Sequence, residues 1–295
     1  MLTREQIRGV LFYEDLIPVI RQALMDFSAG RAVQPIRTIM QAPGREGWLG
    51  VMPCIYGEVM GAKLVTFYPC NAPRQIATHM AVIQLFRTET GEPLATMDGE
   101  LITEMRTAAV SAVAVDELAV RDAKVLAILG SGAQARSHVR ALAGVRSFRE
   151  IRVWSRSREN AERFAGEVGA LVMTAEEAVR GADVVLTLTS SPEPVLKGEW
   201  LRPHAVVCAI GAATPDRREL DEVTMRGAVV VESREAASRE AGDIVLAGVE
   251  VTAEIGELLN GVELERGERP VVFKSVGIAV EDIAAAKLVF ERLRG

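Results

Sequence analysis

The residues from Gly130 to Ala135 read Gly-Ser-Gly-Ala-Gln-Ala, a G-x-G-x-x-A pattern. Gly130 permits a sharp turn, Gly132 lets the backbone approach a pyrophosphate, and the small Ala135 allows a helix to pack tightly on a strand. The apolar run 124–129 precedes the pattern and a helical pattern follows it, so the free N–H groups of a helix start lie at the turn. This context favours a dinucleotide-binding loop over a simple chain reversal. It predicts four cofactor-binding residues: Gly130, Gly132, Ala133 and Gln134.

The end of the next predicted strand indicates which coenzyme is bound. NAD-selective folds place Asp or Glu there, about 20 residues after the glycines, on the ribose 2′-hydroxyl. This chain instead reads Trp154-Ser-Arg-Ser-Arg158. Hydroxyls and guanidinium groups can hold a 2′-phosphate through charge-assisted hydrogen bonds, although a solvated basic turn would look the same. Beside the phosphate loop, the pattern predicts NADPH rather than NADH. The predicted coenzyme contacts after this and the following two strands are Ser155, Arg156, Ser157, Thr189 and Gly211.

Arg106 stands alone among the apolar residues of a predicted helix, Ile102–Leu118, with no further charge before Asp116. A buried guanidinium needs an anion, and a substrate carboxylate would match its two parallel donors. An internal ion pair with Glu104 or Asp98 explains the same pattern equally well. The sequence leaves both interpretations open.

Other isolated polar residues are ambiguous by themselves. Lys63 lies in the short run Gly61–Phe67, where a strand lysine is usually an exposed edge charge. Arg37 and His79 are compatible with a site, with the surface or with a core position. Two further histidines, His138 and His204, are predicted to be structural.

The elements that must position these residues fall into two patterns. A helix is predicted from a capping box at Thr3 and Gln6 to Gly30. Between residues 33 and 98, short strands joined by hairpin turns predict a mixed or antiparallel sheet, with candidate strands at 49–53, 61–67 and 80–86. From about 120 to 232, apolar strands alternate with helices, which is typical of a doubly wound parallel sheet. Ala279–Leu293 is predicted as a final amphipathic helix.

Composition narrows the class of protein. The chain has 295 residues, 34 basic and 40 acidic, so its formal net charge is −6. This mild acidity argues against nucleic acid or an anionic membrane as a partner, and no apolar run approaches the roughly 18 residues of a membrane span. The three cysteines are far apart, which predicts neither a disulfide framework nor a zinc site. The N-terminus shows no apolar segment of a signal peptide. We expect a soluble cytoplasmic protein without a structural metal.

Several segments in order resemble the ornithine cyclodeaminase/mu-crystallin family, and within it the mu-crystallin-type ketimine reductases. The resemblance covers essentially the whole chain. The segments that carry it are Gln34-Pro-Ile-Arg-Thr38, Leu49-Gly-Val-Met-Pro53, Lys63-Leu-Val-Thr-Phe67, Met97-Asp-Gly99, Arg106-Thr-Ala-Ala-Val-Ser-Ala112, Val153-Trp-Ser-Arg-Ser-Arg-Glu-Asn-Ala161, Gly198-Glu-Trp200, Gly211-Ala-Ala-Thr-Pro-Asp216 and Phe273-Lys-Ser-Val-Gly-Ile-Ala-Val-Glu-Asp282.

This resemblance implies a homodimer of two-domain chains, with a Rossmann-type doubly wound α/β domain and a second, α+β domain built from both chain ends. A substrate-binding and dimerisation domain would comprise 1–117 and 279–295, and a Rossmann-type NADP-binding domain would comprise 118–278. Arg37 and Arg106 match the family's substrate-carboxylate arginines, and Lys63 matches its active-site lysine. The substrate would be a small imino acid.

One position departs from the family's deaminating members. They carry an active-site Asp where this chain has Ala213. A preformed iminium accepts a hydride without that acid, whereas release of ammonia needs more proton handling. The expected function is therefore NADPH-dependent reduction of cyclic ketimines such as pyrroline-2-carboxylate and piperideine-2-carboxylate. The alternatives are an ornithine cyclodeaminase, an alanine or other amino-acid dehydrogenase, and a non-catalytic NADPH-containing binding protein.

Overall fold

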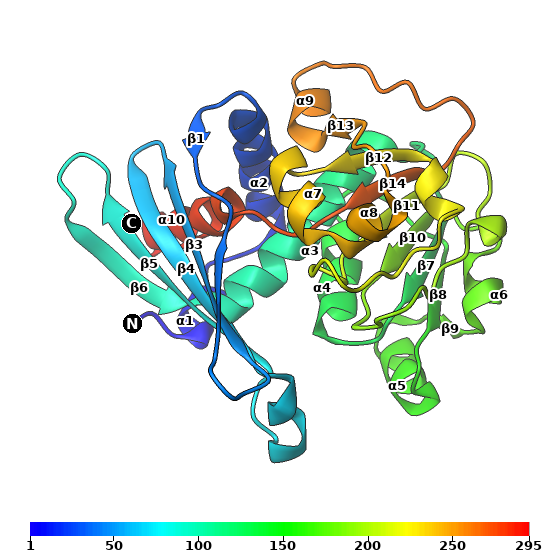
Figure 1. Ribbon diagram of the computed structural model, residues 1–295, viewed down its shortest axis with the longest axis horizontal. Helices are drawn as coiled ribbons and strands as arrows, with labels where there is room; N and C mark the ends of the chain where they lie inside the picture. Colours follow the sequence, from blue (N-terminus) through cyan, green and yellow to red (C-terminus); the bar gives the residue numbers. More distant parts are fainter. Residues whose placement is uncertain (295) are drawn as a thin grey trace. The chain divides into compact units, whose positions relative to one another are not determined.

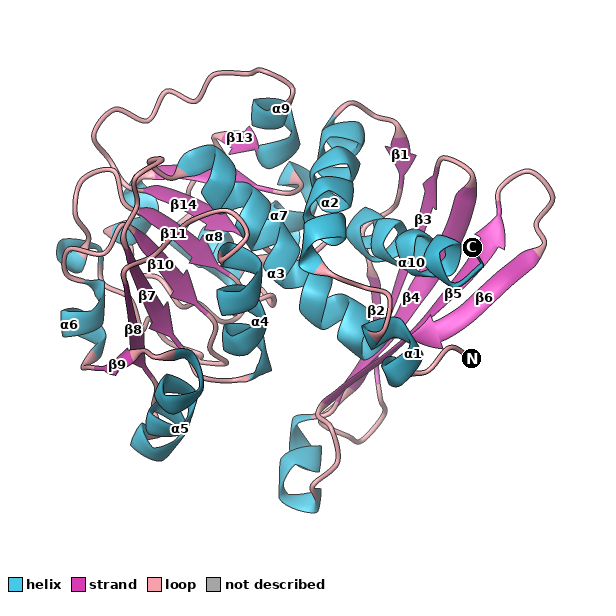
Figure 2. Cartoon of the chain, turned by 180° about the vertical axis from the view of Figure 1, so that it is seen from behind, coloured by secondary structure: helices cyan, strands magenta, loops and turns pink. Residues whose placement is uncertain are grey.

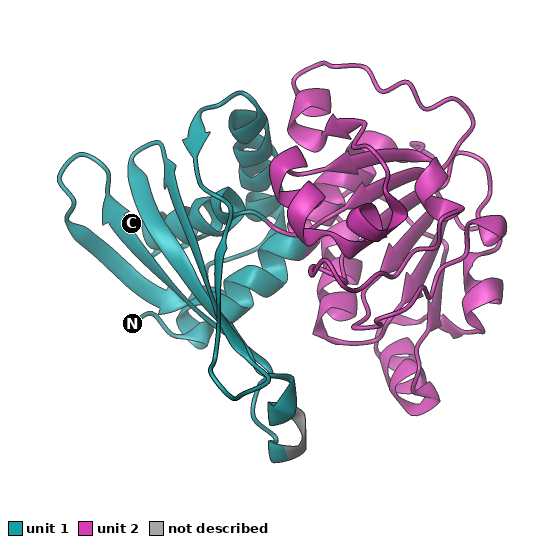
Figure 3. Cartoon of the chain, viewed as in Figure 1, with its two compact units in different colours: residues 1–107, 278–295 teal, residues 108–277 magenta. Residues whose placement is uncertain are grey.

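The computed structural model describes residues 1–294, those at 72 and 73 without their side chains, and the chain forms two compact units (Figure 1, Figure 3). Unit 1 combines residues 1–107 with 278–295, and unit 2 comprises residues 108–277. The sequence-based boundary stands at 117/118, where a helical pattern ends. The compact units instead divide within this helix, α3 (Gly99–Leu118), because the helix is continuous and its two parts belong to different units.

Unit 1 is built on a six-stranded sheet in which every neighbouring pair is antiparallel, as the hairpin pattern predicts. The strand order is β1-β3-β4-β5-β6, and β2 also pairs with β3. The strands are β1 (Ala32–Val33), β2 (Thr38–Gln41), β3 (Trp48–Tyr56), β4 (Val59–Phe67), β5 (His79–Arg87) and β6 (Pro93–Asp98).

Two helices from opposite ends of the chain, α2 (Tyr13–Ser28) and α10 (Ala279–Arg294), pack together in unit 1, and α10 also packs on the sheet (Figure 2). At Gly61 of β4, a Cβ atom would lie 2.2 Å from the carbonyl of Gln84 and 3.0 Å from the Ile283 side chain. The absence of a side chain at Gly61 therefore allows α10 to approach the sheet. Ile283 is fully buried there, and such burial stabilises the fold by about 1.5–3 kcal/mol.

The prediction of one continuous N-terminal helix is wrong, because the segment forms two helices. The capping box of Thr3 and Gln6 is present, but α1 (Arg4–Arg8) ends at Gly9 and α2 begins only at Tyr13. Gly9 is a poor helix former, and Phe12 before α2 has an extended backbone.

Unit 2 contains an eight-stranded sheet in which all neighbours are parallel, which confirms the doubly wound prediction. Its order is β13-β12-β14-β11-β10-β7-β8-β9. The strands are β7 (Val125–Leu129), β8 (Glu150–Trp154), β9 (Leu171–Val172), β10 (Val184–Thr187), β11 (Val206–Ala209), β12 (Ala228–Val231), β13 (Ala253–Glu254) and β14 (Val271–Lys274). The order from β9 to β14 is that of a Rossmann sheet, and the order reverses between β7 and β10.

The remaining helices of unit 2 connect these strands. They are α4 (Ala133–Leu142), α5 (Arg158–Val168), α6 (Ala175–Val179), α7 (Arg234–Glu240), α8 (Gly242–Ala247) and α9 (Ile255–Leu259). Short 3-10 helices occur in both units, η1 (Pro69–Arg74) in unit 1, and η2 (Gly198–Trp200) and η3 (Thr224–Arg226) in unit 2. Within residues 1–294, no helix is long and apolar enough to cross a membrane.

Candidate active site and dinucleotide-binding loop

Lys63 is a buried residue rather than an exposed edge charge. It lies in β4 between Met52 of β3 and Ile83 of β5, and its side chain is 3% exposed. Its Nζ lies 2.6 Å from Oδ2 of Asp282, which is in the first turn of α10 and fully buried. A buried ammonium is costly unless it is paired, and this carboxylate supplies the pairing.

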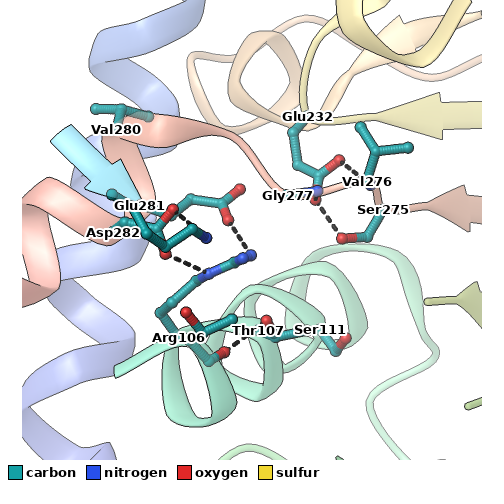
Figure 4. Close-up of polar contacts among 12 residues, drawn as sticks. Arg106, Thr107, Ser111, Glu232, Ser275, Val276, Gly277, Val280, Glu281 and Asp282 are labelled. Atoms are coloured by element: carbon teal, nitrogen blue, oxygen red, sulfur yellow. Dashed lines mark hydrogen bonds and ion pairs between the residues drawn. The ribbon is translucent and has the colours of Figure 1, made fainter. Parts of the chain in front are cut away.

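Arg106 of α3 contacts the same turn of α10 (Figure 4). Its Nε donates to Oδ1 of Asp282 at 2.9 Å, and a terminal nitrogen donates to Oε2 of Glu281 at 2.7 Å. Arg106 forms an internal ion pair, one of the two interpretations the sequence left open, but these contacts do not involve Glu104 or Asp98. Glu104 pairs with Arg4, and Asp98 accepts from the backbone N–H of Leu101, so the acids that meet Arg106 come from the other end of the chain.

Burial and charge set the protonation of this cluster. Burial, together with the positive charges of Arg106 and Arg37, lowers the pKa of Lys63 to about 8, although Asp282 opposes the shift. Burial alone would raise the pKa of Asp282, but Arg106 and Lys63 outweigh it and lower that pKa. Asp282 is therefore ionised at neutral pH, and Lys63 can exchange its proton near neutrality.

Arg37 and His79 belong to the surroundings of Lys63. Arg37 is half-buried just before β2, and its charge acts on both Lys63 and His79. His79 begins β5 and packs against Phe67 and Trp48, with ring centroids 5.8 and 6.4 Å away. Desolvation by its ring neighbours and the cations Lys63, Arg106 and Arg37 lower the pKa of His79, although the residue is exposed at the start of β5. His79 is thus a neutral side chain beside the cations.

Cys54 is the one cysteine on the Lys63 face of the sheet. It is buried opposite Gly61, and burial together with the nearby Asp282 raises its pKa to about 12. It therefore stays a thiol at neutral pH and is unsuited to nucleophilic catalysis.

The predicted phosphate loop in unit 2 has the required geometry. Gly130 follows β7 with φ +124°, and a Cβ there would lie 2.6 Å from the carbonyl of Leu188. Gly132 precedes α4 as its N-cap without a side-chain cap, and nothing lies within 4 Å of the Cβ it lacks. The N-terminal N–H groups of α4 are thus approachable by a pyrophosphate, and the buried Ala135 keeps the helix close to the sheet. Ala133 and Gln134 form the first turn of α4.

The predicted 2′-phosphate residues follow β8. The hydroxyl of Ser155 accepts from that of Ser131 at 3.0 Å, which ties this turn to the phosphate loop. Ser157 is the N-cap of α5 and accepts from the N–H of Asn160. Arg156 is exposed, while Arg158 pairs with Glu162 one helical turn on. Basic and hydroxyl groups at a helix N-terminus form a suitable environment for a phosphate dianion.

Sequence reasoning missed the roles of Glu281 and Asp282. Two acids in the otherwise apolar run Ala279–Ala286 carry the same signal that singled out Arg106, since an isolated charge in an apolar helix needs a partner. It also missed four fully buried charged residues in unit 2: Glu219, Glu232, Asp243 and Lys274.

The parallel sheet, its strand order and its glycine loop define an α/β protein of the Rossmann-type dinucleotide-binding class. More narrowly, the chain belongs to the ornithine cyclodeaminase/mu-crystallin family, whose model matches residues 1–295.

Known proteins of this family resemble the chain over nearly its whole length. Ketimine reductase mu-crystallin of Mus musculus is 46% identical over 285 residues, 94% of this chain and 91% of that protein. The structure of Thermococcus litoralis Delta(1)-pyrroline-2-carboxylate reductase in complex with NADH and L-proline is 33% identical, with a TM-score of 0.94 over 99% of this chain and 97% of that one. An archaeal alanine dehydrogenase dimer with bound NAD is 31% identical, with a TM-score of 0.95 over 99% and 95%.

Proposed function

We propose that the protein is an NADPH-dependent ketimine reductase that converts small cyclic ketimines, of the pyrroline-2-carboxylate or piperideine-2-carboxylate type, to L-amino acids. The observation that carries the proposal is the buried cluster in which Asp282 holds both Lys63 and Arg106. The resemblance to a ketimine reductase and to a pyrroline-2-carboxylate reductase supports it.

Each residue of the cluster has a separate task in this proposal. Arg106, helped by Arg37, binds the substrate carboxylate and so decides which face of the ring is presented. Lys63 lies near the imine nitrogen and maintains it in its protonated form, which makes the C=N carbon electron-poor. Asp282 keeps Lys63 and Arg106 in place. NADPH, when bound, supplies the hydride that this carbon receives.

The coenzyme would be held by unit 2. Gly130, Gly132, Ala133 and Gln134 would surround the pyrophosphate, and Thr189 and Gly211 would lie at the nicotinamide end. Ser155, Arg156 and Ser157 would hold the 2′-phosphate, which makes NADPH the preferred coenzyme. Unit 1 would bind the substrate, and we place the protein in the cytoplasm because its composition is acidic and poor in cysteine.

We also propose a homodimer formed through the sheet of unit 1. The strand register puts several exposed apolar side chains on the face opposite Lys63: Val33, Met40, Ile55 and Leu64. Soluble monomers rarely expose such contiguous apolar patches. The similar archaeal alanine dehydrogenase is a dimer. Light scattering should give twice the 31.9 kDa of one chain, and Leu64→Lys should shift the mass to that of a monomer.

The function is tested by following NADPH oxidation with a panel of substrates. The panel contains the two cyclic ketimines and pyruvate with ammonium or methylamine. Ornithine with NAD is assayed separately by the ammonia and proline released, because that conversion has no net oxidation or reduction. We expect the cyclic ketimines to be reduced best. Turnover confined to pyruvate with ammonium would instead identify an alanine dehydrogenase. Tight NADPH binding without turnover of any imine would identify a binding protein.

A further inference from the structure

Four charged side chains are fully buried in unit 2 without belonging to the proposed coenzyme contacts. One of them, Glu232, accepts from Ser275 and Val276, and the other three form a separate network. Lys274 ends β14, Asp243 lies in the first turn of α8, and Glu219 lies in the connection between β11 and β12. All three are 0% exposed. Charges buried at this cost require a structural or functional explanation.

Glu219 fixes Thr189, the second residue after β10. Its Oε1 accepts from the backbone N–H of Thr189 at 2.7 Å and from the Thr189 hydroxyl at 2.6 Å, and its Oε2 accepts from the Thr187 hydroxyl at 2.7 Å. Burial raises the pKa of Glu219, while Lys274 and these donors oppose the shift. Two of these three hydrogen bonds come from Thr189 and restrict its position, and the third comes from Thr187 at the end of β10.

Lys274, paired with Asp243, fixes Gly211, the second residue after β11. The Lys274 ammonium donates to the carbonyl oxygen of Gly211 and lies 2.9 Å from Oδ2 of Asp243. Oδ1 of Asp243 accepts from the backbone N–H groups of Glu219 and Leu220 at 2.8 and 2.9 Å. The same network therefore holds both the backbone that carries Glu219 and the turn at Gly211.

The two turns leave no space between them. A Cβ on Gly211 would lie 2.2 Å from the carbonyl oxygen of Thr189 and 2.5 Å from the carboxyl carbon of Glu219. Any movement of the Glu219 carboxylate would consequently displace both the turn at Thr189 and the turn at Gly211.

The location of these turns points to one half of the coenzyme. In a Rossmann sheet, β7, β8 and β9 form the half that binds the adenosine part of the dinucleotide, and β10, β11 and β14 form the other half. Glu219, Asp243 and Lys274 all lie at the carboxyl ends of the strands β10, β11 and β14. The glycine loop after β7 and the serines after β8 have other partners.

We propose that Glu219 is a positioning residue for the nicotinamide half of NADPH, acting through Thr189 and Gly211 and assisted by Lys274 and Asp243. The inference rests on the proposed reductase function. A misplaced nicotinamide would lengthen the hydride-transfer distance, and small displacements of this kind reduce rates strongly.

The experiment compares Glu219→Ala, Glu219→Gln and Lys274→Met in the full-length protein. Asp221→Asn is the matched control, since Asp221 also caps backbone N–H groups in unit 2, those of Gly198 and Thr224, away from the two turns. Binding is measured with NADPH and with 2′,5′-ADP, which represents only the adenosine half. Turnover of the ketimine is measured with NADPH and with its deuterated form.

We expect Glu219→Ala to weaken NADPH binding and kcat about 10-fold each while 2′,5′-ADP binding changes less than about 2-fold. The isotope effect on kcat should rise, and Glu219→Gln should restore most of the activity because its amide retains the shape and one acceptor. Equal loss of NADPH and 2′,5′-ADP binding, or no loss of either, would overturn the inference. If Glu219→Ala does not fold, Lys274→Met decides by the same two ratios, because it removes the ammonium that holds Gly211.

The wild type separates this inference from the proposed function. Binding of NADPH without ketimine turnover would end the reductase proposal, while the affinity ratio for the two ligands would still decide on Glu219. A wild type that does not bind NADPH would overturn both.

Discussion

Lys63 and Asp282 form a buried ion pair of 2.6 Å between β4 and α10, near opposite ends of the chain. Asp282 is shared, because its other oxygen accepts from Arg106. One carboxylate thus supports both the lysine proposed to act at the imine nitrogen and the arginine proposed to bind the substrate carboxylate.

Replacement of Asp282 by Asn should move the pH profile of ketimine reduction. Without its anionic partner, the pKa of Lys63 falls below its present value of about 8, so the protonated form is lost at lower pH. The descending limb of kcat/KM, expected near pH 8 in the wild type, should move toward acid, and kcat/KM at neutral pH should fall about 10–100-fold. In Lys63→Arg the limb should vanish, since arginine does not titrate. Persistence of the limb in that variant would assign it to another group.

Replacement of Arg106 by Ala should lower kcat/KM for the ketimine, because a charged contact with the substrate carboxylate is removed. The loss should correspond to roughly 2–5 kcal/mol of transition-state stabilisation. The KM for NADPH should stay nearly unchanged. Since Glu281 and Asp282 would each lose one buried cationic contact, urea unfolding must be measured alongside, and Arg106→Lys serves as the variant that keeps the charge. Unfolding with full activity per folded molecule would make Arg106 purely structural.

Arg156→Ala should raise the KM for NADPH and leave that for NADH unchanged. Arg158→Ala is its control, because that exposed side chain pairs with Glu162 and should change neither KM. Steady-state kinetics with both coenzymes measure the effect. A wild type that prefers NADH would contradict the assignment of the 2′-phosphate site.

The protein should form no significant proline from ornithine and NAD. Ala213 offers no acid to the departing ammonia. The nearest carboxylate along the sequence belongs to Asp216, which is exposed. The nearby Thr214 hydroxyl lowers the pKa of Asp216, so it is ionised at neutral pH. Assays of ammonia and proline measure the reaction. Rates comparable to ketimine reduction would make the protein a cyclodeaminase, and their loss in Asp216→Asn would identify the substitute acid.

Acidification should destabilise unit 2 through His138. This histidine is fully buried, with Nε2 2.9 Å from the Ser111 hydroxyl, and burial lowers its pKa from 6.5 to about 4. Because the unfolded chain then binds the proton more readily, stability is lost as pH falls from 6.5 toward 4. Between pH 7 and pH 5 the loss from this group is about 2 kcal/mol. Urea unfolding should show this loss in the wild type and a correspondingly smaller one in His138→Gln.

Local patterns predicted much of the fold. The glycine loop, the parallel sheet and the antiparallel strands around Lys63 each follow from periodicity or turn residues over a few neighbouring positions. The break after Arg8 was not predicted, since the apolar spacing continues on both sides of it. Strand β14 was missed because the alternation of strands and helices was followed only to residue 232, and the long connection after β12 breaks that alternation.

The partners of the candidate site residues could not be predicted in the same way. Arg106 suggested a nearby acid, but spacing along the sequence cannot show that α10 returns to the sheet of unit 1. Lys63 looked like an edge charge because burial of β4 depends on that same helix. For Glu219 and Lys274, the contacts join turns that are adjacent only once the sheet has formed.

The split of unit 1 between residues 1–107 and 278–295 also has a consequence for synthesis on the ribosome. Unit 2 is continuous and can fold as soon as it has emerged, but the sheet of unit 1 must wait for α10. Until then Lys63 and Arg106 lack the acids that neutralise them, and the apolar surface beneath α10 is uncovered. The residues of the candidate site therefore come together only after unit 2 has been synthesised, and a nascent polypeptide that ends before Asp282 carries the Rossmann-type unit without the cluster of Lys63, Arg106 and Asp282.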